Sequence, residues 1–357
     1  MRGDVVYQYA FDVANEIVTR DVRQILGLPV ATFEPRAAHS VPRDVPLYRA
    51  LAVTLDREIY VNGHAARVQV RVYEVGVVAI SIAASFEVPT LKELRELHVP
   101  QATNVPSLDD WARQVCVDVC ASLGGSLVRS SVPSEPEAYT VFCVSELGAS
   151  DVAVWFESQR REVAALVAEL ASDELSDQQV DESLRIVRSC TRRDLVVIDW
   201  DACLLVELDG NFDDLLYVLE LANVQLEEFR VMDRRLDRHL ERAYRDLEQA
   251  SRWSWRSPTA MLDWLRRFRV DVTKLADEVS HITKFFGDWY LARVYLGACE
   301  RFHLAEWRAS VDRRLEELDE VYRVLQSDVY ERRMLWLEVV IVVCFIVDLL
   351  AIFFWKR

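Results

Sequence analysis

The sequence lacks the short motifs that mark the common enzyme classes. It contains no GxSxG nucleophile elbow, no HExxH zinc motif and no glycine-rich dinucleotide fingerprint, and no phosphate-binding lysine follows Gly124-Gly125. These absences argue against the hydrolases, metalloproteases and nucleotide-binding enzymes that such motifs identify. We therefore predict that the chain has no cofactor and is not an enzyme.

Lysine and paired cysteines are also scarce. The seven cysteines are scattered without a CxxC pair, and their odd number does not suit a disulfide framework. This pattern is typical of reduced thiols in a cytosolic setting. Arginine supplies nearly all of the positive charge, and the net charge is −16. No nucleic-acid partner is expected, because phosphate backbones attract basic surfaces.

The longest apolar run lies at the end of the chain, over residues 335–355. As a helix, its roughly 21 residues would span about 31 Å, close to the ~30 Å hydrocarbon core of a bilayer. Trp336 and Trp355 lie near its two ends, where tryptophan favours the membrane interface. Glu338 and Asp348 interrupt the run, and a carboxylate as deep as Asp348 is expected to face protein rather than lipid. The run predicts a C-terminal transmembrane anchor over 334–357 that also self-associates.

The flanking charges predict how this anchor is oriented. Residues 1–23 carry charges throughout and have no uninterrupted apolar core, unlike a signal peptide. Arginines upstream of the apolar run outnumber the two basic residues after it, Lys356 and Arg357. The positive-inside rule then places the body on the cytoplasmic side of the membrane. The predicted localisation is a single-pass membrane protein in contact with the lipid bilayer.

Strand and helix patterns mix in the first part of the chain. Alternating or continuous apolar runs predict strands at 49–56, 66–86 with a turn near Gly76, 137–147, and a hairpin at 194–208 folded near Trp200. Helical periodicity predicts helices at 90–97, 107–123 with Ser107 as N-cap, and 151–170. Together these patterns predict an α+β head over residues 1–209.

A coiled-coil-type pattern begins after Gly210. Between Leu215 and Ala250, apolar residues recur at alternating steps of four and three, the spacing of a helix seam. The central seam positions are Leu226, Phe229, Asp233, Leu236 and Leu240. Such seams more often form an intramolecular core than an oligomer interface, but the polar Asp233 and Asp348 raise the oligomer alternative.

Further helices follow before the apolar run. Ser257-Pro258 is typical of a helix start, and that helix is predicted to continue to Phe286. The last helix is predicted from residue 304 to 355, because no proline or glycine interrupts it. Short links between long helices favour antiparallel packing. Residues 210–333 are therefore predicted to form an antiparallel helical stalk.

Two patterns favour an enzyme instead. Asp199-x-Asp201 after an apolar strand resembles the nucleophile motif of haloacid-dehalogenase-type phosphatases, although Cys203 stands where threonine is expected and a helical region follows. Two pairs with Glu-x-x-His spacing resemble the ligands of a di-iron carboxylate bundle. These pairs are Glu278 with His281 and Glu300 with His303. For both pairs, solvent-exposed salt bridges are the alternative.

The segments 285–326 and 331–350 resemble the C-terminal end of the family named "required for meiotic nuclear division", whose bacterial members are YagE-like. VYEVGVVAISIAASF at 72–86 resembles the early β segment of that family. The resemblance implies an α+β N-terminal part, a helical second half and a C-terminal membrane helix that carries an acidic residue. It implies large assemblies and carries over no catalytic residue.

These observations together predict a non-enzymatic scaffold or tethering protein. It would be anchored in the membrane, homo-oligomeric, and would carry a cytosolic α+β head. A metal-dependent or phosphatase-like enzyme is the alternative.

Overall fold

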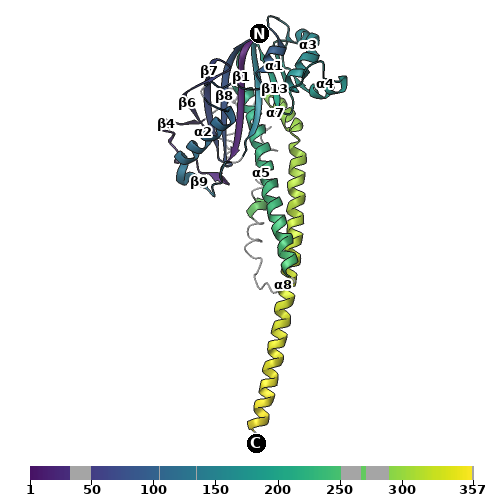
Figure 1. Ribbon diagram of the computed structural model, residues 1–357. Coiled ribbons are helices and arrows are strands. Elements are labelled where there is room, and N and C mark those ends of the chain that lie inside the picture. Colours follow the sequence, from purple (N-terminus) through teal and green to yellow (C-terminus); the bar gives the residue numbers. More distant parts are fainter. Residues whose placement is uncertain (33–49, 104, 134, 251–266, 271–288, 356–357) are drawn as a thin grey trace. The chain divides into compact units, whose positions relative to one another are not determined.

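The computed structural model describes residues 1–32, 50–103, 105–133, 135–250, 267–270 and 289–355 (Figure 1). The chain divides into two compact units. Unit 1 comprises Met1–Val231 and Asp277–Trp307, and unit 2 comprises Met232–Ala276 and Arg308–Arg357.

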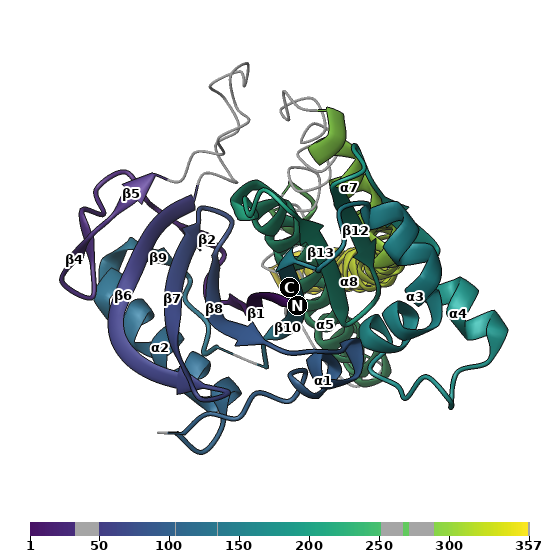
Figure 2. The ribbon, with the colours of Figure 1, turned by 90° about the horizontal axis from the view of Figure 1, so that it is seen from above.

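A nine-stranded sheet organises unit 1, in the order β11-β12-β13-β10-β1-β8-β7-β6-β5 (Figure 2). Its central strand, β1 (Arg2–Asp12), runs antiparallel to β8 (Val77–Glu87) and to β10 (Glu137–Glu146). β10 and β13 pair in parallel, and the other neighbours are antiparallel. The other strands are β5 (Ala31–Thr32), β6 (Ala50–Val61), β7 (His64–Tyr73), β11 (Ile186–Arg188), β12 (Asp194–Ile198) and β13 (Ala202–Glu207). Two small ribbons pair β2 (Glu16–Ile17) with β9 (Leu127–Val128) and β3 (Gln24–Ile25) with β4 (Leu28–Pro29).

The two faces of the sheet bind different helices, because successive side chains of a strand point to opposite faces. On one face, Tyr9 of β1 donates a hydrogen bond to Asp109 of α2 (Leu108–Leu123) at 2.8 Å. On the other, Gln8 donates to the backbone carbonyl of Leu216 in α5 (Asp213–Ala250) at 3.3 Å. The first face carries the main apolar core, which includes Val5, Tyr7, Tyr9 and Phe11. The helices are α1 (Leu91–Glu96), α2 (Leu108–Leu123), the 3-10 turn η1 (Gly124–Ser126), α3 (Val152–Val167), α4 (Asp177–Ser183), α5 (Asp213–Ala250), α7 (Trp289–Arg301) and α8 (Leu304–Trp355).

Several local predictions are confirmed. The Ser107 hydroxyl accepts the backbone N–H of Asp110 and caps α2. The turn between β7 and β8 contains Gly76 at φ +102°, where an added Cβ would lie 2.0 Å from the carbonyl oxygen of Ala14. β12 and β13 form the predicted hairpin around Trp200, and α8 begins at Leu304 as predicted.

The predicted transmembrane helix is wrong. Within the described ranges, no helix has both the length and the apolar character needed to cross a membrane. This finding corrects the predicted membrane anchor with Trp336 and Trp355 at the membrane interface. It also corrects the predicted single-pass localisation.

Unit 2 contains the second half of α5, residues 267–270 and α8 from Arg308. Arg314 of α8 pairs with Asp233 of α5 at 3.2 Å and also with Asp237. The buried apolar residues are Leu236, Ala243, Phe268, Val311, Leu315, Leu318 and Tyr322. Most of the helix predicted over 258–286 lies outside the described residues.

Candidate functional site

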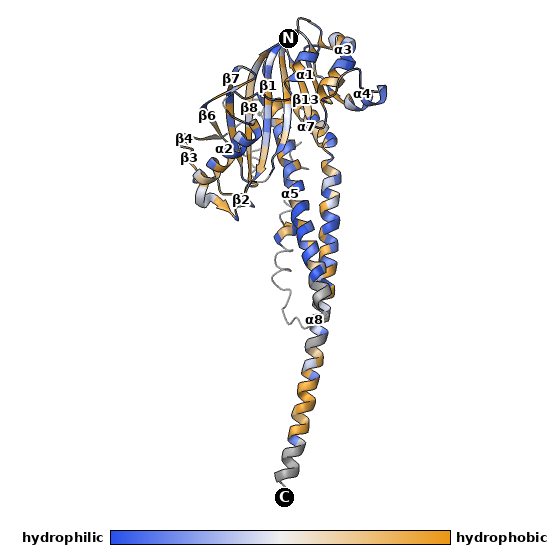
Figure 3. Cartoon of the chain, in the orientation of Figure 1, coloured by the Kyte–Doolittle hydropathy of each residue, from blue (hydrophilic) through white to orange (hydrophobic). Residues whose placement is uncertain are grey.

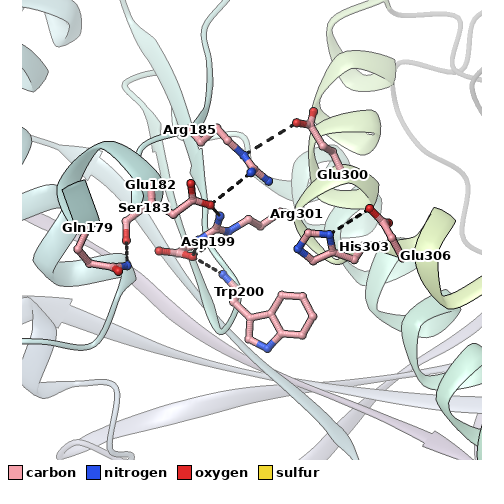
Figure 4. A network of polar contacts seen from close by, with 10 residues as sticks. All are labelled: Gln179, Glu182, Ser183, Arg185, Asp199, Trp200, Glu300, Arg301, His303 and Glu306. Atoms are coloured by element: carbon pink, nitrogen blue, oxygen red, sulfur yellow. Dashed lines mark hydrogen bonds and ion pairs between the residues drawn. The ribbon is translucent and has the colours of Figure 1, made fainter.

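A buried ion pair joins the end of α7 to the β12–β13 turn (Figure 4). Arg301 donates its Nε–H to Asp199 Oδ1 at 2.9 Å, and its Nη2 contacts the same oxygen. Its Nη1 donates to Glu182 Oε1 at 2.8 Å. The two central side chains are only 9% and 6% exposed. Burial works to lower the pKa of Arg301, but the hydrogen bond and charge of Asp199 outweigh it and raise that pKa.

Further hydrogen bonds join Asp199 to its own turn and to Tyr139. Its carboxylate accepts the backbone N–H of Trp200 at 2.7 Å, and its backbone carbonyl accepts the hydroxyl of Tyr139 at 3.0 Å. Phe302 packs edge-on against the rings of Tyr139 and Trp200. The residue that matches a phosphatase nucleophile is therefore a buried anchor. Its neighbour Asp201 has a raised pKa, caused by burial and by the nearby charges of Glu169 and Asp199.

Glu300 and His303 lie beside this ion pair but contact different partners. Glu300 is 4.0 Å from Arg185, and His303 Nδ1 is 3.4 Å from Glu306. His303 occupies the junction between α7 and α8 with φ +52°. In the part of the chain that the structure describes, no three His, Cys, Asp or Glu residues are grouped so that they could hold a metal ion. Glu278 and His281 lie outside the described residues, so the di-iron alternative stays a prediction.

A second buried polar cluster, centred on Glu220 of α5, joins that helix to the sheet. Its carboxylate accepts hydrogen bonds from Arg71 at 2.6 Å, Tyr73 at 2.6 Å and Ser81 at 2.9 Å. Burial, followed by the charge of Glu220, raises the pKa of Tyr73 well above its usual value. This cluster was not predicted from the sequence. The signal was one arginine, Arg71, in the apolar strand segment VQVRVY and a single glutamate in the apolar helix LLYVLELANV.

The residues of the predicted α5 seam are engaged within the chain. Leu226, Phe229 and Leu236 are buried, and Leu240 is half-buried. Asp233, the polar seam position, pairs with Arg314 at 3.2 Å and accepts a hydrogen bond from Ser310 at 3.4 Å. An intramolecular partner therefore accounts for Asp233, which gives no support to an oligomer at that position.

An open pocket of about 440 Å³ lies at the end of β1. Its charged residues neutralise one another. Arg2 pairs with Glu87 at 2.8 Å, and Asp4 is bound by Arg67 at 2.6 Å and by Ser85 at 2.7 Å. This arrangement indicates no particular ligand.

In the part of the chain that the structure describes, a row of exposed apolar residues lies on α8 of unit 2 (Figure 3). We call residues Met334–Val347 the apolar segment. Its large apolar side chains are each between 46% and 66% exposed. They are Met334, Leu335, Trp336, Leu337, Val339, Val340, Ile341, Val342, Val343, Phe345, Ile346 and Val347. Glu338 is the one charged residue among them.

Comparison with known proteins places the first part of the chain in a family. A family model described as "Uncharacterized protein MJ0711, N-terminal domain" matches residues 2–213, from β1 to the start of α5. The Uncharacterized protein MJ0711 of Methanocaldococcus jannaschii is 22% identical over 214 residues, which cover 60% of this chain and 65% of that protein. No solved structure matches.

These matches correct the earlier family assignment. They give no support to the resemblance to the "required for meiotic nuclear division" family. The matching model covers more than half of the chain, and the protein therefore belongs to the uncharacterised family of the MJ0711 N-terminal domain.

Proposed function

We propose that this protein is a scaffold that self-associates through the apolar segment of α8. The observation that supports the proposal is the exposure of every large apolar side chain from Met334 to Val347. Monomeric proteins rarely expose contiguous apolar patches larger than a few hundred Å². Larger patches mark surfaces that bind a partner.

Burial of these apolar side chains would contribute favourably to association. Removing one Val, Leu, Ile or Phe side chain fully from water is worth about 1.5–3 kcal/mol. The apolar segment offers a continuous row of such side chains. Even when only one side of the helix is covered, the free energy gained by burying several side chains offsets part of the entropy lost on association.

The mass of the purified full chain tests the proposal. In sedimentation equilibrium, we expect a concentration-dependent mass above that of the 41.2 kDa chain. A variant with changes around the whole helix, Leu337→Gln, Ile341→Gln, Val343→Gln and Val347→Gln, should sediment as the single chain. A wild-type protein that stays at 41.2 kDa over the whole concentration range would contradict the proposal.

A further inference from the structure

We infer that Cys116 and Cys120 of α2 hold a Cu(I) ion between their two sulfur atoms. The two residues lie one helical turn apart, on the side of α2 that packs on the sheet. Cys116 is 0% exposed, and Cys120 is half-buried. The inference is independent of the proposed self-association, because α2 belongs to unit 1 and the apolar segment to unit 2.

The two thiols contact each other directly. Cys116 donates its S–H to the sulfur of Cys120, and this hydrogen bond raises the pKa of Cys116 and lowers the pKa of Cys120. Burial adds to the raised pKa of Cys116. Cys120 is therefore the thiol that more readily becomes a thiolate, which is the form that binds metal ions. Because Cys120 is half-buried, it is also the thiol that an ion from solvent reaches first.

A disulfide does not suit this pair, whereas a bridging ion does. On an α-helix, residues four apart hold their Cβ atoms about 5–6 Å from each other. A disulfide needs about 3.5–4.5 Å between Cβ atoms, so α2 would have to unwind between Cys116 and Cys120. Two metal–sulfur bonds of about 2.3 Å, on opposite sides of an ion, separate the sulfurs by about 4.6 Å. An intact helix provides this separation.

The number of ligands selects the ion. Thiolates are soft ligands that favour Cu(I), zinc and iron–sulfur clusters. Structural zinc takes four ligands, and iron–sulfur clusters are typically held by four cysteines. Among the described residues, no three His, Cys, Asp or Glu side chains are grouped to hold a metal ion, so the site offers two thiols. Two thiolates suffice for Cu(I), which forms a bond to each sulfur while each thiol releases its proton to water.

Competition for Cu(I) tests the inference on the full chain. The background variant Cys190→Ser/Cys344→Ser removes the two exposed thiols. The reduced protein is titrated without oxygen against the coloured Cu(I)–bicinchoninate complex, and loss of colour reports transfer of Cu(I). We expect the background variant to take one Cu(I) per chain. Cys120→Ser in that background should weaken binding at least tenfold, whereas Cys299→Ser, at another half-buried helical cysteine, should bind as the background does.

A second variant shows whether both sulfurs are needed. Cys116→Ala should lose as much affinity as Cys120→Ser, because either change leaves the ion with a single ligand. Far-UV circular dichroism checks the fold, and the half-buried Cys120→Ser decides the question if Cys116→Ala unfolds.

Three outcomes would overturn the Cu(I) site and leave the proposed self-association standing. The first is a background variant that takes no Cu(I), or that binds it no more tightly than Cys120→Ser does. The second is a sedimenting mass that rises when Cu(I) is added, because the ion would then join two chains. The third is Zn(II) binding as tight as Cu(I) binding, because zinc requires further ligands.

Discussion

Single buried charges hold unit 1 together at two places, Glu220 and Asp199. In each case a carboxylate meets an arginine with little access to water, 2.6 Å from Arg71 and 2.9 Å from Arg301. A buried pair adds little net stability compared with an apolar pair, but removal of one partner leaves an uncompensated charge. These residues therefore determine which helix packs where on the sheet more than they determine total stability.

Glu220→Ala should lower the free energy of unfolding by about 3–5 kcal/mol, because Arg71 would remain buried without its counter-charge. Urea denaturation monitored by circular dichroism measures this loss. Glu241→Ala, at an exposed position of the same helix, should change stability by less than about 0.5 kcal/mol. If the double variant Arg71→Met/Glu220→Leu were no more stable than Glu220→Ala, the stranded charge would not be the cause.

Asp194 makes stability depend on pH. Burial works to raise its pKa, but hydrogen bonds from Thr191, Tyr290 and the backbone N–H of Cys190 outweigh burial and lower it. A lowered folded pKa stabilises the fold above the unfolded pKa of about 3.9, and this contribution is lost as the pH falls through the folded pKa. Asp194→Asn should therefore be less stable than wild type at pH 7, and the difference should shrink below about pH 4. Urea denaturation across this range checks it. A difference that is constant with pH would contradict the assignment.

Close packing of α7 on the sheet depends on one glycine. A Cβ on Gly297 would lie 2.8 Å from Cγ2 of Ile186 and 3.6 Å from Cδ1 of Ile198. Glycine inside a helix normally costs about 1 kcal/mol relative to alanine. At this position, the close approach of β11 and β12 explains why glycine is present.

Gly297→Ala should therefore destabilise unit 1 by about 1–3 kcal/mol, the usual cost of overpacking. This is the opposite of the stabilisation that the intrinsic helix preference for alanine alone would predict. Thermal unfolding compares it with Leu296→Ala, an exposed neighbour on α7 that should be nearly neutral. Ile186→Ala in the same chain removes the clashing methyl group, so the two costs should not add. Strict additivity would show that Ile186 is not the obstacle.

For the whole molecule, self-association links stability to protein concentration. A partner that binds only the folded chain stabilises it by mass action. The midpoint of thermal unfolding should therefore rise with protein concentration in the wild type and be independent of it in the four-residue glutamine variant. Differential scanning calorimetry over a hundredfold concentration range measures both. A wild-type midpoint that does not move would indicate that the apolar segment does not bind a copy.

The compact units also differ from the local patterns in the sequence. Those patterns predict segments 1–209, 210–333 and 334–357, each continuous in sequence. The units are assembled from separate stretches, so that α5 and α8 each contribute to both. The apolar periodicity of a long helix predicts which side of the helix is buried. It does not predict which neighbouring element covers each part of that side, so one helix can belong to two cores.

Features that depend on neighbours in sequence could be predicted. The Ser107 cap, the β12–β13 hairpin and the start of α8 at Leu304 depend on residues close together in sequence, and Gly76 favours a turn through its own backbone freedom. The central strand β1 was missed. Its residues 5–12 are all buried, so its segment VVYQYAF lacks a clear alternation of apolar and polar residues, and its place depends on pairing with β8 and β10, far along the chain.

The sequence by itself determined helices α1, α2 and α3, the Ser107 cap and the turn at Gly76, and it placed a long apolar stretch near the end of α8, because these depend on short-range sterics and periodicity. Only the tertiary structure decided that Asp199 is bound by Arg301, that Glu220 is bound by Arg71, and that the apolar segment is uncovered within the described residues. Those contacts join residues about 100 or more positions apart, and no local pattern specifies which distant side chain a buried charge will meet.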